Sequence, residues 1–119
     1  MELLSNLNRF QQVQNIILKG FDPVSARGFT QVPNFILKNA ELSSNAKVAY
    51  ALLLSYAWNL NRVFPGQERM AEDMGTSQPT VARAIGELET IGYLEINRRG
   101  QGLTNIYVLH HTVKHQRKR

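Results

Sequence analysis

Apolar residues recur three or four positions apart along much of this chain, the spacing that places side chains on one face of an α-helix. This pattern predicts helices over 2–18, 44–59, 67–74 and 78–91, and a single helical turn over 34–38. Residues 93–96 alternate between apolar and polar positions, and 104–109 are expected to return as a second strand after a glycine-rich turn. Residues 29–32 form a further, short strand candidate. The pattern therefore predicts a mainly α fold with a small β-hairpin.

The ends of the two later helices carry residues suited to those positions. Gly75 follows 67–74 as a left-handed C-terminal residue would, and Gly92 stops the last helix. Ser77 is placed to cap the helix that follows it, and Pro79 falls in the first turn, where a missing N–H costs nothing. A tight glycine turn is thus expected between the two helices.

The expected inward face of 78–91 is formed by Val81, Ile85 and Leu88, with the last two within about 40° of the first around the helix axis. The opposite side of that helix carries Pro79, Arg83, Gly86 and Thr90. The inward residues expected of the two preceding helices are Val48, Ala49, Leu52, Leu53 and Tyr56, then Met70, Ala71 and Met74. Trp58 is expected to pack in the core or at its rim.

Residues 19–28 are rich in glycine and proline, which interrupt helices, and they separate an extra N-terminal helix from the rest of the chain. We therefore divide the sequence into an N-terminal helix and connector at 1–28, a main domain at 29–109 and a basic tail at 110–119. The N-terminal helix has two interpretations: it folds back onto its own domain, or it forms the interface of a homodimer. The tail also has two interpretations: it is a solvated chain end, or it is a basic arm that lies along the phosphates of a nucleic acid.

Composition narrows the classes of function. The 119 residues suit one domain, and the absence of cysteine excludes disulfides, thiolate zinc sites, iron–sulfur clusters and cysteine nucleophiles. No signal peptide or membrane-spanning stretch is apparent, so a cytoplasmic protein without a membrane partner is expected. The net charge is +5, and seven of the 14 basic residues but only three of the 9 acidic ones follow residue 75. A basic chain of this kind points first to nucleic acid.

The order of the elements indicates how nucleic acid could be bound. A helix, a two-turn helix, a glycine turn, a capped helix and a hairpin with a basic tip follow one another as in a winged helix-turn-helix. In that arrangement the capped helix enters the major groove of double-stranded DNA. The hairpin tip, or wing, approaches the minor groove, which suits arginine.

The candidate DNA-binding residues come from these two elements: Ser77, Gln78, Pro79, Thr80, Arg83, Arg98, Arg99 and Gln101. Arg83 could donate two hydrogen bonds to guanine or bind a phosphate, and Gln78 could form hydrogen bonds with adenine. Thr80 could touch a thymine methyl or a phosphate, and Ser77 with the N–H groups beside it suits a phosphate. Arg83, Gln78 and Thr80, each taken alone, are equally explained as surface or capping residues, so their prediction depends on the exposed side of one helix that they share. The alternative for the wing is a hairpin that needs turn residues and carries two arginines for solubility.

Several stretches together resemble the winged helix-turn-helix domains of bacterial plasmid, phage and mobile-element replication initiators and related regulators. These stretches are Asn39 to Lys47, Phe64 to Ser77, Thr80 to Leu88 and Gly92 to Glu95. The resemblance, over 29–109, implies DNA contact by the segment from Ser77 to Arg83 and a wing at Arg98 and Arg99. Gly66 stands where such domains often have a serine cap, and the chain has no room for the further domain of full initiators. Many such domains act as dimers.

Three classes of function fit these residues. The first is a sequence-specific transcriptional regulator acting as a dimer, the second a replication initiator that binds origin repeats, and the third a protein-interaction module that uses the fold without DNA. An enzyme is not expected, and neither is a cofactor, a metal site or a small-molecule ligand. Glu68, Glu72 and Asp73 lie beside Arg69 as a solvated face would, rather than as a metal cluster. His110, His111 and His115 offer an i, i+4 pair without a third ligand.

Overall fold

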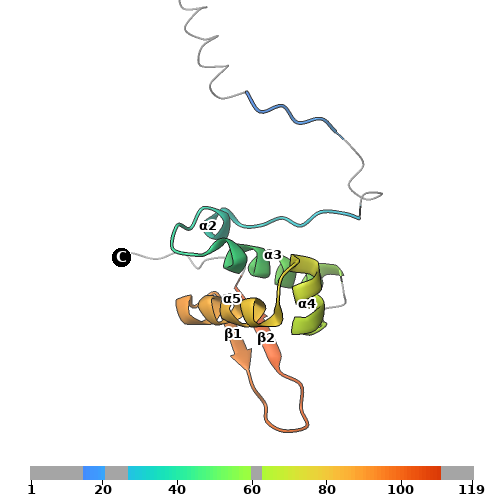
Figure 1. The fold of residues 1–119 in the computed structure, drawn as a ribbon, viewed down its shortest axis with the longest axis vertical. Helices are drawn as coiled ribbons and strands as arrows, with labels where there is room; N and C mark the ends of the chain where they lie inside the picture. Colours follow the sequence, from blue (N-terminus) through green and yellow to red (C-terminus); the bar gives the residue numbers. More distant parts are fainter. Residues whose placement is uncertain (1–14, 21–26, 60–62, 111–119) are drawn as a thin grey trace, which may run out of the picture.

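The computed structural model describes residues 15–20, 27–59 and 63–110. Within them the chain forms α2 (Asn34–Leu37), α3 (Ser44–Asn59), α4 (Gln67–Met74), α5 (Gln78–Ile91), β1 (Leu94–Asn97) and β2 (Ile106–Leu109). These bounds confirm the predicted helices over 44–59, 67–74 and 78–91 and the helical turn near residue 34. The described part is mainly helical with one antiparallel hairpin, as Figure 1 shows.

Two predictions for the region before α2 are wrong. Residues 15–18, the end of the predicted N-terminal helix, are not helical, and residues 1–14 lie outside the described residues. The side chains of Ile16, Ile17 and Leu18 are 79%, 75% and 90% exposed, so no packing supports a helix there, and a short helix without packing is marginal in water. Residues 29–32 do not form a strand, because no described strand lies beside them to complete a ladder.

The core lies where α3, α5 and β1 meet, and α4 closes one end of it. α3 and α5 run side by side, and α4 crosses at one end of the pair (Figure 1). The largest fully buried side chains come from these four elements and from α2: Ile36, Tyr50, Met70, Val81, Leu88 and Leu94. None of the described helices is long and apolar enough to cross a membrane.

The buried face of α3 differs in part from the predicted one. Ala49, Leu53 and Tyr56 are buried as expected, but Val48 is 45% exposed. Ala46, Tyr50 and Leu54 are buried instead, which turns the buried stripe slightly around the helix. α3 is apolar on most of its circumference, so its spacing alone does not select one stripe. Trp58 is 50% exposed, in keeping with a place at the rim of the core.

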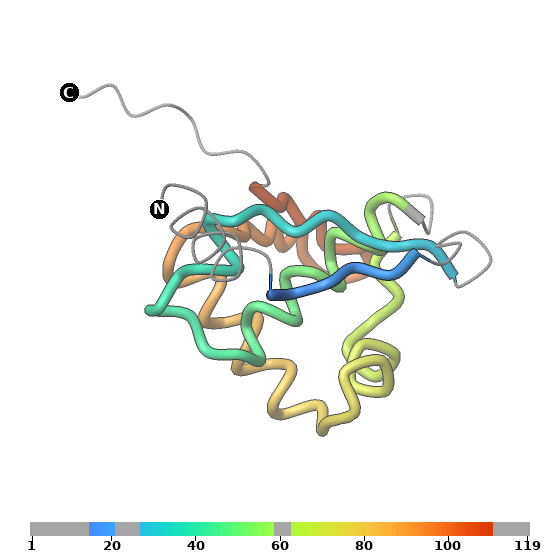
Figure 2. The backbone as a smooth tube through the Cα atoms, turned by 90° about the horizontal axis from the view of Figure 1, so that it is seen from above, coloured from blue at the N-terminus to red at the C-terminus, as the bar shows by residue number. Residues whose placement is uncertain are grey.

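The turn between α4 and α5 follows the predicted signals. Gly75 has φ of 72°, in the left-handed region that favours glycine. The Ser77 hydroxyl oxygen accepts the Thr80 backbone N–H at 3.3 Å, which caps α5, and Pro79 lies in its first turn. Figure 2 shows this turn, in yellow, at the outer border of the molecule. The beginning of α5 is therefore presented to the outside rather than enclosed by other elements.

The hairpin pairs β1 with β2 in antiparallel register, with Leu94 opposite Leu109 and Asn97 opposite Ile106. The second strand begins two residues later than the predicted start at 104. The loop between the strands carries Gly100 and Gly102, both with positive φ. It projects away from the helices, beyond α5 (Figure 1). The predicted basic tail lies outside the described residues after His110.

Candidate nucleic-acid interface

α5 divides into a buried aliphatic side and an exposed polar side. Val81, Ala84, Ile85 and Leu88 are buried, which confirms the predicted inward stripe. Gln78, Pro79, Arg83 and Thr90 are exposed, whereas Thr80 and Gly86 are half-buried. The helix therefore lies with its polar flank toward solvent, as an external ligand would require.

The exposed residues at the start of α5 form a short chain of hydrogen bonds. The hydroxyl oxygens of Ser77 and Thr80 lie 3.0 Å apart, and a terminal nitrogen of Arg83 donates to Thr80 Oγ1 at 3.2 Å. No acidic residue occupies the first turn. The N–H groups at this end carry the positive end of the helix dipole, and Arg83 adds a full positive charge nearby. This end of α5 therefore favours an anion.

Both wing arginines have partners within the chain. The two terminal nitrogens of Arg98 donate to the two carboxylate oxygens of Glu89 on α5, at 3.1 and 3.3 Å. These hydrogen bonds and the charge of Glu89 raise the pKa of Arg98. Arg99 donates from Nε to the Thr104 carbonyl oxygen at 2.8 Å and from a terminal nitrogen to Thr104 Oγ1 at 3.0 Å. Gln101 is exposed in the same loop.

The sequence-predicted site residues thus fall into two groups. Ser77, Thr80 and Arg83 are joined by hydrogen bonds along α5, and Arg98 ties the wing to that helix through Glu89. Sequence reasoning did not find Glu89 as a partner of the wing. The only local signal was its place near the end of α5, which does not reveal a partner beyond the following turn.

Glu87 supports α5 from the side of α3. Its carboxylate oxygens accept the Ser43 backbone N–H at 2.8 Å and the Ser43 hydroxyl at 2.7 Å. These two hydrogen bonds lower the pKa of Glu87. Ser43 Oγ also accepts the Ala46 backbone N–H at 3.1 Å, so the group that caps α3 is anchored to α5. This contact, 44 residues apart in sequence, helps to set the angle at which α5 lies across the domain.

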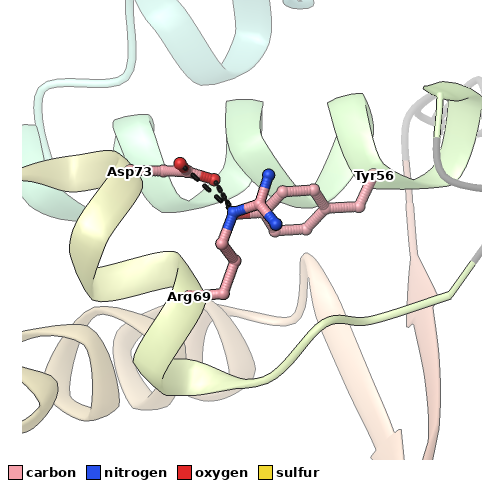
Figure 3. Close-up of polar contacts among 3 residues, drawn as sticks. All are labelled: Tyr56, Arg69 and Asp73. Carbon is pink, nitrogen blue, oxygen red and sulfur yellow. Dashed lines mark hydrogen bonds and ion pairs between the residues drawn. The ribbon is translucent and has the colours of Figure 1, made fainter.

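A second polar contact attaches α4 to α3 (Figure 3). The Tyr56 hydroxyl donates to Asp73 Oδ2 at 2.9 Å, and Arg69 Nε lies 3.3 Å from the same oxygen. Burial of the ring and the nearby Asp73 carboxylate raise the pKa of Tyr56. Asp73 therefore links the two helices at the surface, and Glu68, Arg69, Glu72 and Asp73 are all exposed, as the predicted solvated face of α4 requires.

The described residues contain no group of three or more histidine, cysteine, aspartate or glutamate side chains placed to hold a metal ion. His110 Nε2 lies 2.9 Å from a carboxylate oxygen of Glu95, across the hairpin. The two other histidines considered in the sequence, at positions 111 and 115, lie outside the described residues.

Comparison with known proteins agrees with this geometry. Residues 40–94 match a protein family described as a helix-turn-helix domain, and this range includes α3, α4 and α5. The fold is a winged helix-turn-helix. A solved structure described as the N-terminal domain of a DNA binding protein is similar, with a TM-score of 0.60 at 20% sequence identity, over 85% of this chain and 89% of that chain. None of the curated proteins matches this winged-helix chain.

Proposed function

We propose that this winged-helix protein binds double-stranded DNA and acts as a sequence-specific transcriptional regulator, as a dimer on two half-sites. The observation that carries the proposal is the exposed polar flank of α5, with its capped N-terminus and Arg83 on the same side. The helix-turn-helix match over 40–94 and the DNA binding protein whose fold is similar both support it.

α5 has the dimensions for this role. Its 14 residues rise about 21 Å, and the major groove, about 12 Å wide, admits one α-helix. Gln78 and Thr80 would face base edges from the first turn, with Pro79 beside them. Ser77 and the N–H groups around it would meet a phosphate. Arg83 gives one terminal nitrogen to Thr80 and keeps further N–H donors for guanine or a phosphate.

The wing would contact the minor groove or the adjoining phosphates through Arg98, Arg99 and Gln101. The Arg99 bonds across the loop to Thr104 hold the loop closed, which brings its glycines to the tip. The Glu89–Arg98 pair is exposed, and exposed ion pairs contribute only about 0–1 kcal/mol. A phosphate could therefore replace Glu89 at small cost.

The proposal is tested by fluorescence polarisation with duplexes selected from fragments of the source genome, over a range of salt concentrations. Affinity should fall with a slope of about −0.9 in log K against log salt for each phosphate contact. A weak, flat response would overturn DNA binding and favour a protein-interaction module. Bound fragments that fall in a replication origin rather than upstream of genes would favour the replication initiator, which the resemblance over 29–109 supports.

Charge reversal of the Glu89–Arg98 pair tests the wing contact. We expect Arg98→Glu to weaken binding to all sequences alike and to reduce the salt slope by about 1, because a phosphate contact is lost. Glu89→Arg should strengthen binding, because it removes the carboxylate that competes for Arg98. The double variant, Glu89→Arg with Arg98→Glu, restores the ion pair in reverse, and we expect its salt slope to stay reduced.

The measurement is again polarisation, on one duplex with the selected sequence and one with a scrambled sequence. Recovery of wild-type affinity and slope by the double variant would contradict a phosphate contact of Arg98. It would show that this arginine acts only by holding the wing against α5.

A further inference from the structure

A groove of about 1030 Å³ lies between the end of α3 and β2, apart from α5 and its polar flank. Among the described residues, which leave out 60–62 between Trp58 and Val63, no charged residue lines it. Four of its apolar residues remain well exposed: Trp58, Val63, Ile106 and Val108 are 50%, 60%, 43% and 41% exposed. Apolar side chains that gather in one hollow offer a surface that a partner segment could cover.

The chemistry of the groove restricts what can occupy it. An uncharged apolar lining disfavours a charged segment, because a buried charge without a partner is costly. The C-terminal end of the chain, with four basic residues among its last six, is therefore a poor occupant. Residues 11–18 carry no charge at all, and Ile16, Ile17 and Leu18 within them are exposed to solvent.

The shape of that segment also suits the groove. Residues 17–20 have no helix or turn, and β2 belongs to a two-stranded sheet, so β2 has an outer edge beside the groove within the described part of the chain. An extended apolar peptide can add to such an edge through its backbone and place alternate side chains in a neighbouring hollow. Ile16 to Leu18 would then be covered at the same time as Trp58 and Val108.

We infer that the segment around Ile16–Leu18 of a second copy docks in the groove between α3 and β2, and that each copy docks on the other. The segment stands exposed in its own chain, so the chain does not cover its own groove with it in this structure. The exchange uses the same contact twice around a two-fold axis, which closes the dimer. This inference specifies the dimer of the proposed function, but its test needs no DNA.

The absence of cysteine from the sequence permits a direct test. A tagged Ile17→Cys chain is mixed with an untagged Val108→Cys chain, allowed to exchange, and oxidised. The expected product is a disulfide-linked heterodimer, which a reducing thiol separates into its two chains. Its yield should clearly exceed the yield obtained when Leu37→Cys takes the place of Val108→Cys. Leu37 is a matched control, because it is 53% exposed on α2 and does not line the groove. Equal yields with Leu37→Cys would overturn the inference.

A single chain carrying both Ile17→Cys and Val108→Cys distinguishes exchange from docking within one chain. Exchange predicts covalent dimers on a non-reducing gel. An internal bond in a monomer would overturn the exchange.

A second test changes the docking segment and leaves the residues of the groove unchanged. Ile16, Ile17 and Leu18 are replaced by serine, which an exposed segment tolerates. Light scattering is expected to give a dimer for the wild type and a monomer for this variant. The emission of Trp58, the only tryptophan, should shift to the blue with rising concentration in the wild type alone. A variant that remains a dimer, or a monomeric wild type at high concentration, would overturn the inference. A monomer that still binds its duplex with a steep salt slope would leave DNA binding standing.

Discussion

Leu88→Ala is expected to lower the free energy of unfolding by about 2–5 kcal/mol, the range for truncation of a buried leucine. Leu88 is fully buried on the inward side of α5, the helix that packs on α3, α4 and β1. Truncation would leave a cavity at the centre of these contacts. Urea unfolding followed by circular dichroism measures the change.

Thr90→Ala on the same helix is the matched control, because Thr90 is exposed. Surface substitutions of this kind usually change stability by no more than about 0.5 kcal/mol. Equal effects of the two substitutions would mean that the aliphatic side of α5 does not lie in the core. The polar flank would then not be the outward one, and the proposed DNA contact would lose its basis.

Arg83→Ala is expected to weaken specific DNA binding by about 1–3 kcal/mol, or about 5- to 150-fold, and to relax base preference at one position. Arg83 lies on the exposed flank of α5, held by Thr80 one turn earlier. Its loss removes a bidentate donor that only the correct base satisfies. Polarisation with a set of duplexes, each altered at one position, measures both effects at a single salt concentration.

Lys38→Ala serves as the control, since Lys38 is an exposed cation at the end of α2. It should leave the preference among duplexes unchanged. A preference profile that also stays unchanged in Arg83→Ala would contradict base recognition by this arginine. A uniform loss of affinity with a smaller salt slope would assign Arg83 to a phosphate instead.

The helices of the main domain could be predicted because their signals act within one or two turns. Gly75, Ser77 and Gly92 mark the ends of α4 and α5, and the structure places each one as predicted. The segment at 15–18 shows the opposite case. Its apolar spacing predicted a helix, but helical spacing stabilises a helix only when another surface covers its apolar side.

The candidate site could be predicted only as far as one helix and one hairpin. The outward side of α5 follows from the spacing of Val81, Ile85 and Leu88, so the exposure of Arg83 was predictable. The partners of the acidic residues on α5 could not be predicted. Glu87 meets Ser43 and Glu89 meets Arg98, and Tyr56 meets Asp73 in the same way. A charged side chain that binds such a partner has no distinguishing sequence pattern of its own.

The order of the elements, the glycine turn before α5 and the polar flank of that helix follow from local signals along the chain, since caps, turns and helical periodicity are local. Tertiary packing selects which stripe of α3 is buried and which charged groups are held by the protein's own residues. It also creates the groove beside Trp58. These features arise where residues distant in the sequence come together, and their energies depend on burial and geometry that no single segment contains.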